Sequence, residues 1–150
     1  MGKPYLASFE TWSLDPRREA AQLAHAANEL AFFLHAAALQ VQAEPLMRRA
    51  LAIDEQSFGK EHPSVAIGLN NLAQLLQDTN RLAEARPLMR RALEIFLQFS
   101  HATGHRHLHL QTAMNNYAGL LRAMGRSAEQ VAAELNAMSE PYGIRIGGDS

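Results

Sequence analysis

A seven-residue sequence occurs twice in this chain, and it constrains the fold more than any other feature. Pro45–Leu51 recurs without change as Pro87–Leu93, 42 residues later. Matched residues flank both copies at the same offset, including Asn28 with Asn70, Leu30 with Leu72, Leu34 with Leu76, Ala43 with Ala85, and Ile53 with Ile95. A fixed period of a few tens of residues is typical of proteins that stack copies of one small structural unit.

A third copy begins later in the chain. Asn70–Ala73 returns as Asn115–Ala118 with one change, 45 residues on, and the three additional residues fall near His101–His107. The sequence therefore predicts three units within residues 17–138. We expect an N-terminal capping segment at 1–16, units at about 17–58, 59–100 and 104–138, and a C-terminal tail at 139–150.

Each unit is predicted to consist of two helices. The chain has 26 Ala and 21 Leu but only 3 Val, 5 Ile and 4 Thr, a composition that favours helix over strand. In the middle unit, His62–Ser64 contains a proline suited to a helix start, and Asp78–Asn80 is a turn cluster between two apolar stripes of helical period. Gly125 marks the same break in the third unit. We expect an all-α protein of about six helices.

Three local features depart from this pattern. Pro87 lies inside the second stripe of the middle unit and predicts either a small kink or a late-starting helix. The first unit has no Gly, Asn or Pro between Ala36 and Gln40, so its helices are expected to run on longer. In the third unit, Gln130 and Glu134 replace small or apolar residues, which suggests a degraded repeat.

Several functional classes find no support in the sequence. There is no Cys for disulfides, thiol chemistry or Cys-ligated zinc, and a net charge of −1 argues against a nucleic-acid-binding face. No Gly-rich phosphate loop, metalloprotease motif or nucleophilic-serine motif occurs, so we expect no enzyme activity and no cofactor. No apolar run is long enough for a membrane span, and the lack of an export signal indicates the cytoplasm.

The repeated residues carry a family likeness. The motif formed by Leu72, Ala73, Leu76, Ala85, Met89, Ala92 and Leu93 resembles the tetratricopeptide repeat (TPR), and the 42-residue period resembles the variant found in kinesin light chains. The resemblance covers about residues 17–138. It implies a right-handed superhelical stack of three helix–turn–helix repeats that serves as a non-catalytic scaffold and binds a peptide or protein segment in its concave groove.

In this family the first helix of each repeat lines the groove, so the likeness also implies candidate contact residues. They are His25, Asn28, Glu29, Phe32, His35, Ile67, Asn70, Asn71, Gln74, Gln77, Thr112, Asn115, Asn116, Gly119 and Arg122. Asparagine recurs among them, and an amide both donates and accepts hydrogen bonds, as capture of a peptide backbone requires. Alternatively, these asparagines hydrogen-bond neighbouring helices.

Other polar clusters have competing explanations. Histidines at 101, 105, 107 and 109 could bind zinc or nickel, although a solvated linker is favoured because no carboxylate accompanies them. Arg48–Arg49 and Arg90–Arg91 could bind phosphate, but nearby acidic residues favour helix-spaced ion pairs. His25 and Glu29 could form an acid/base pair, but a surface ion pair is preferred.

The ends of the chain suggest further contacts. The apolar segment Lys3–Leu14 is predicted to cap the first helix pair or to contact another chain, and Tyr142, Ile144 and Ile146 are expected to cover the open face of the last pair. Two alternatives to peptide binding remain open. One is homodimerisation through open ends of the stack, with Leu135 in the exposed stripe, and the other is a role as the C-terminal repeat region of a larger signalling protein.

Overall fold

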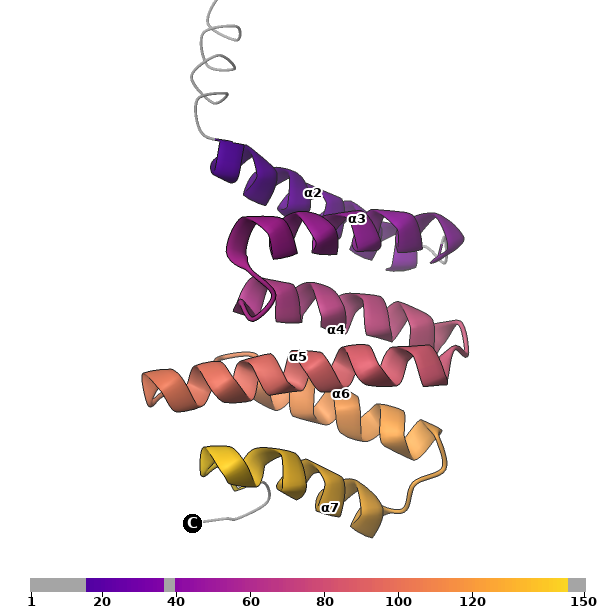
Figure 1. Cartoon of the computed structure of the whole chain (residues 1–150). Coiled ribbons are helices and arrows are strands. Elements are labelled where there is room, and N and C mark those ends of the chain that lie inside the picture. Colours follow the sequence, from indigo (N-terminus) through magenta and orange to yellow (C-terminus); the bar gives the residue numbers. More distant parts are fainter. Residues whose placement is uncertain (1–15, 37–39, 146–150) are drawn as a thin grey trace, which may run out of the picture. The chain divides into compact units, whose positions relative to one another are not determined.

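The computed structural model describes residues 16–36 and 40–145, and every regular element in that part is helical. The elements are α2 (Pro16–Ala36), α3 (Gln40–Phe58), α4 (Pro63–Asp78), α5 (Leu82–Thr103), α6 (Leu110–Ala123), α7 (Ala128–Ser139) and the short 3-10 helix η1 (Glu140–Tyr142) (Figure 1). The chain divides into two compact units, Met1–Lys60 and Glu61–Ser150. The predicted all-α fold with six α-helices is confirmed.

The first unit contains one helical hairpin, in which α2 packs against α3. Its buried contact surface is built mainly from small residues, namely Ala24 and Ala31 on α2 and Ala43 and Ala50 on α3. Alanines lack bulk, so the two helices approach closely. Helix α2, with 21 residues, is longer than its counterpart α4, with 16, as the sequence predicted, whereas α3, with 19 residues, is shorter than its counterpart α5, with 22. Residues 37–39 themselves lie outside the described residues.

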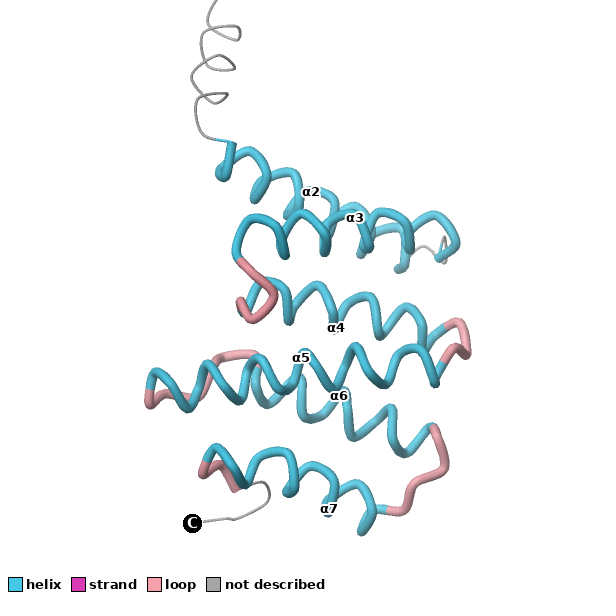
Figure 2. Tube along the Cα trace, viewed as in Figure 1, coloured by secondary structure: helices cyan, strands magenta, loops and turns pink. Residues whose placement is uncertain are grey.

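The second unit contains four helices whose connections alternate between opposite ends, so successive helices run antiparallel (Figure 2). Helix α5 is central to this unit because it contacts both α4 and α6. Its apolar stripe, including Met89, Leu93 and Phe96, is buried, as are Leu72 on α4 and Tyr117 on α6. The second helix of one repeat thus contacts the first helix of the next.

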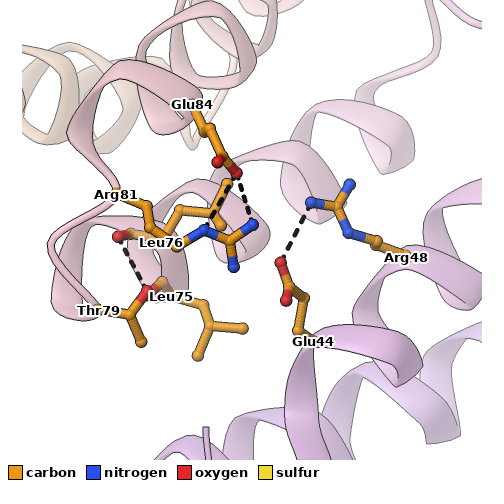
Figure 3. Close-up of polar contacts among 7 residues, drawn as sticks. All are labelled: Glu44, Arg48, Leu75, Leu76, Thr79, Arg81 and Glu84. Carbon is orange, nitrogen blue, oxygen red and sulfur yellow. Dashed lines mark hydrogen bonds and ion pairs between the residues drawn. The ribbon is translucent and has the colours of Figure 1, made fainter. Parts of the chain in front are cut away.

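Both predicted turns in this unit use a left-handed residue. Asn80 follows α4 with φ of 61°, and Gly125 follows α6 with φ of 90°. The backbone N–H of Arg81 donates to the Leu76 carbonyl at 2.7 Å, and the corresponding bond in the third repeat joins Arg126 to Leu121 at 3.0 Å. These bonds satisfy carbonyls at the helix ends, as in the Schellman motif. The Thr79 hydroxyl, drawn in Figure 3, closes the same turn by donating to the Leu75 carbonyl at 3.0 Å and to the Leu76 carbonyl at 3.1 Å.

The proline within α5 does not delay the helix. Helix α5 begins at Leu82, five residues before Pro87, so the late start is wrong. Proline cannot donate to the carbonyl four residues earlier, on Ala83. Both residues are exposed, so water can satisfy that carbonyl.

The two unexpected polar residues of α7 both have structural roles. Gln130 forms a reciprocal capping box with Ser127, in which each side chain accepts a hydrogen bond from the other's backbone N–H. Glu134 accepts hydrogen bonds from the Tyr117 hydroxyl at 2.7 Å and from the Arg86 guanidinium at 2.8 Å. These contacts join α5, α6 and α7. The third repeat is therefore differently stabilised rather than degraded.

The network contains one ion pair, between Arg86 and Glu134. Burial acts to raise the pKa of Glu134, but the hydrogen bonds from Tyr117 and Arg86 outweigh it and hold that pKa below its ordinary value. The hydrogen bonds that Arg86 donates, to the Tyr117 hydroxyl first and then to the Glu134 carboxylate, raise the pKa of Arg86. Glu134 is therefore ionised and Arg86 protonated at neutral pH.

The described part of the C-terminal tail contacts both α5 and α7 through η1. Tyr142 lies against α5, where its carbonyl is 3.2 Å from Nδ1 of His101 and its ring is 6.0 Å from the His101 ring. Ile146 lies outside the described residues. Leu135 and Met138 of α7 are buried, so the expected exposed stripe at Leu135 is absent from the described part of α7.

Replacing the left-handed glycine of the third repeat should destabilise the protein. Gly125→Ala forces a Cβ into a positive-φ conformation at a cost of about 1–2 kcal/mol. Gly119→Ala is the matched control, because Gly119 lies within α6 and an added Cβ would meet no atom within 4 Å. That control should gain about 0.5–1 kcal/mol from helix propensity. Urea unfolding followed by circular dichroism measures both changes, and an equal effect in the two variants would contradict this account of the turn.

Removing the buried hydroxyl of the α5–α6–α7 network should also lower stability. Tyr117→Phe deletes the donor to the Glu134 carboxylate, and hydrogen bonds to charged groups contribute about 1.5–3 kcal/mol. Tyr142→Phe provides a matched control, since its hydroxyl is 3.5 Å from Gln98 at the surface and should contribute less than about 0.5 kcal/mol. Thermal unfolding of both variants tests the difference.

Candidate functional site

The candidate site lies in the second unit, where α4 and α6 leave a hollow of about 390 Å³. Its lining is predominantly polar, and it is formed by Gln74, Gln77, Asp78, Asn115, Asn116 and Gly119. Five of these six are residues that the repeat register assigned to a groove. The structure thus brings the expected faces of two neighbouring repeats together, although their role in binding stays a prediction.

The remaining predicted residues of α4 and α6 flank this hollow in the sequence. On α4, Asn70 and Asn71 are half-buried and Ile67 is exposed. On α6, Thr112 and Arg122 are exposed. The face combines amides with one apolar and one cationic side chain.

Two amides, Asn116 in the lining and Asn70 one turn before Gln74 on α4, have polar atoms without partners. Oδ1 of Asn70 and Nδ2 of Asn116 are buried but make no hydrogen bond within the described part of the chain. Asn115 differs, because its Oδ1 accepts from Nε2 of Gln111 at 3.0 Å. An unpaired buried amide atom costs free energy, which a ligand that supplies the missing hydrogen-bond partner would recover.

Asp78 is a lining residue that the sequence argument missed. It was assigned to the turn after α4, whereas the helix extends to include it. Its spacing of four residues from Gln74 places both on one face of α4, which is the signal that could have identified it. Asp78 adds an acidic side chain, which the predicted residues of α4 and α6 lacked.

In the first unit, the predicted residues occupy the exposed side of α2. His25 and Glu29 are a highly exposed pair, with Nε2 and Oε1 3.0 Å apart, as the surface interpretation predicted. Oδ1 of Asn28 is buried and lacks a partner within the described residues, as at Asn70. Phe32 is 63% exposed. The side chain of His35 lies outside the described residues.

The repeated arginines form the helix-spaced ion pairs that the sequence favoured. Arg48 pairs with Glu44 at 3.2 Å on α3, and Arg90 pairs with Glu94 at 3.3 Å on α5. Figure 3 shows the first of these pairs and, in the other unit, the Arg81–Glu84 pair at the start of α5. These cations are offset within their own helices, so the phosphate-binding alternative gains no support.

The histidine cluster forms an aromatic contact at the connection from α5 to α6. The ring centroid of His107 lies 4.7 Å from that of Phe96, 5.1 Å from that of Phe99 and 5.5 Å from that of His109. Across residues 16–36 and 40–145, no three His, Asp or Glu side chains gather as a metal site would require. The cluster instead orders the connection between two helices.

Histidine side chains also hold the turns between repeats. Nδ1 of His62 accepts from the Ser64 N–H at 3.0 Å at the start of α4, and Nδ1 of His107 accepts from the His109 N–H at 3.1 Å before α6. Both bonds need an unprotonated nitrogen. Burial first, and then the neighbouring His109, lower the pKa of His107 below its ordinary value.

Comparison with known families agrees with this architecture. A family model described as tetratricopeptide repeat matches residues 22–98, which is half of the chain. This chain belongs to the tetratricopeptide repeat family. A search of curated proteins gives no match. The resemblance to the kinesin-light-chain variant stays a prediction.

Family membership sets the general role of this TPR protein. TPR repeats mediate protein–protein interaction, and the family typically provides scaffolds rather than catalysts. The matched range ends within α5. The third hairpin, formed by α6 and α7, is therefore identified from the structure and not from the family match. Among the described helices, none combines the length and the apolarity that crossing a membrane requires.

The lowered pKa of His107 predicts that stability falls in weak acid. The folded state favours neutral His107, so its stabilisation is complete above the unfolded pKa of about 6.5 and is lost as pH falls through the lower folded pKa. His107→Asn keeps a side-chain acceptor that does not titrate, so its unfolding free energy should depend less on pH between 7 and 5. His105→Asn, at an exposed position, serves as the control. Identical pH profiles for wild type and His107→Asn would contradict the prediction.

Proposed function

We propose that this TPR protein binds an extended peptide segment of a partner protein in the hollow between α4 and α6. The observation that carries the proposal is the pair of unpartnered amide atoms, Oδ1 of Asn70 and Nδ2 of Asn116. One amide oxygen and one amide N–H are the complements of a peptide backbone N–H and carbonyl.

The composition of the site favours backbone recognition over an apolar anchor. Five of the six lining residues carry amides or a carboxylate, and the sixth is glycine. Backbone hydrogen bonds are common to all peptides, so side-chain preference must come from the surroundings. Ile67 and Arg122, both exposed, are proposed to supply an apolar and a cationic contact.

The corresponding face of α2 is proposed to take part as well, on the repeat register alone. Asn28 matches Asn70 and has the same unpartnered buried oxygen. Phe32 supplies an exposed aromatic ring. His25, Glu29 and His35 complete the proposed set on this helix.

Substitution of the two unpartnered amides tests the proposal. Peptides selected from a random phage-displayed library against the whole chain serve as probes, and fluorescence polarisation measures their affinity. Asn70→Ala with Asn116→Ala should weaken binding by about 5- to 150-fold, because two hydrogen bonds contribute about 1–3 kcal/mol together. Folding stability should change little, since neither atom has a partner to lose.

The control is Gln98→Ala on α5, an exposed amide outside the hollow. Its affinity should equal that of the wild type. Unchanged affinity in the Asn70/Asn116 double variant, or selected peptides that bind the control and the double variant equally weakly, would contradict binding in this hollow. Failure to select any peptide from the library would contradict peptide binding itself.

A further inference from the structure

The hollow between α4 and α6 is lined in part by a glycine that the helix itself does not require. Gly119 lies within α6, where glycine is less stable than alanine because it loses more backbone freedom on folding. Its backbone is helical, so any residue could adopt its conformation. A Cβ added there would meet no heavy atom within 4 Å, so close packing does not require glycine either. What the glycine provides is open space in the hollow.

The other repeats carry a side chain at this position. The repeat register matches Gly119 with Gln74 in the second repeat and with Phe32 in the first. Gln74 lines the same hollow from α4. The hollow therefore has a long side chain on its α4 wall and bare backbone at the matching point of its α6 wall. The missing side chain widens the hollow on the α6 side.

The lining of this space favours a positively charged occupant. Among the described residues that form it, Asp78 is acidic, none is basic, and four carry amides whose oxygens accept hydrogen bonds. The residues that α4 contributes, Gln74, Gln77 and Asp78, lie in the last two turns of that helix. The C-terminal end of a helix carries partial negative charge, so a cation is stabilised there.

Two nearby groups bear on this preference. Asp78 also interacts with other groups of the chain, so a contact with a ligand would add to an existing interaction. Arg122, three residues after Gly119 on α6, is exposed and is not among the lining residues. The carboxylate therefore remains the charge within the described lining itself.

We propose that Gly119 keeps open a subsite for one lysine or arginine side chain of the bound peptide segment, with Asp78 and the amide oxygens as acceptors. The inference rests on the proposed function, to which it adds selectivity for a side chain. Lysine and arginine side chains only donate hydrogen bonds, which matches a lining of carboxylate and amide oxygens. An acidic side chain in the same place would meet Asp78 as a like charge and be disfavoured.

Filling the subsite tests the role of the glycine. Gly119→Gln introduces the side chain that the second repeat carries, and fluorescence polarisation measures its affinity for peptides selected against the whole wild-type chain. Binding should weaken by about 10-fold, because the ligand side chain loses its contacts. The Tm should equal or exceed that of the wild type, since glutamine favours helix more than glycine does. Ala132→Gln is the matched control, because it places the same side chain on the exposed surface of α7 and should leave affinity unchanged.

A second measurement tests the charge of the occupant. Replacing the basic residue of a selected peptide by norleucine removes its charge and keeps an aliphatic side chain. On the wild type this replacement should weaken binding by about 3- to 10-fold, from the combined effects of the carboxylate and the helix end. It should have little effect on Gly119→Gln, whose subsite is filled, or on Asp78→Asn, whose lining charge is removed.

Three outcomes would overturn the subsite. They are equal affinity of Gly119→Gln and wild type, selected peptides that contain no lysine or arginine, and a norleucine effect of the same size in the wild type and both variants. Any of these with weakened binding by the Asn70→Ala, Asn116→Ala double variant would leave the proposed function standing and remove only this inference. Failure to select any peptide would contradict both.

Discussion

The structure depends on the inability of one helical hairpin to bury its own apolar surface. Each first helix has a wide apolar stripe, and only part of it faces the second helix of the same hairpin. In the second unit, α5 packs on α4, its partner in the hairpin, and also on α6, the first helix of the next hairpin, so the apolar stripe of α6 is buried between two hairpins. Shared burial of this kind explains why Phe96, near the middle of α5, is almost completely inaccessible to solvent. Removing one hairpin would expose surface on its neighbour.

The same constraint leaves a polar face available on the first helices. Packing consumes the sides of α4 that carry Leu69 and Leu72, and the opposite side retains amides. The side chains on that opposite side are not needed for packing, so they can be chosen for contact with other molecules. Five amide or carboxylate side chains around one hollow are consistent with this division between packing and recognition.

Much of this architecture could be predicted from the sequence, because repetition and apolar spacing report directly on packing. The repeat register assigned Asn70 and Asn115 to a groove, and Asn115 lines the hollow together with Gln74, one turn after Asn70. The roles of Gln130 and Glu134 could not be predicted from that register, since each depends on a contact specific to the third repeat. Gln130 needs Ser127 three residues earlier, and Glu134 needs Arg86 from the preceding hairpin. In a comparison of repeats, Gln130 and Glu134 only depart from the pattern, whereas the structure shows the partner of each side chain.

The link from Arg86 to Glu134 also fixes the order in which these hairpins can be joined. The position equivalent to Arg86 in the third repeat is Val131, a buried aliphatic residue. A chain in which the third hairpin followed a copy of itself would therefore place a carboxylate beside valine, with no guanidinium to neutralise it. The three modules are thus not interchangeable, and artificial arrays assembled from them must keep this junction intact or replace both of its charges together.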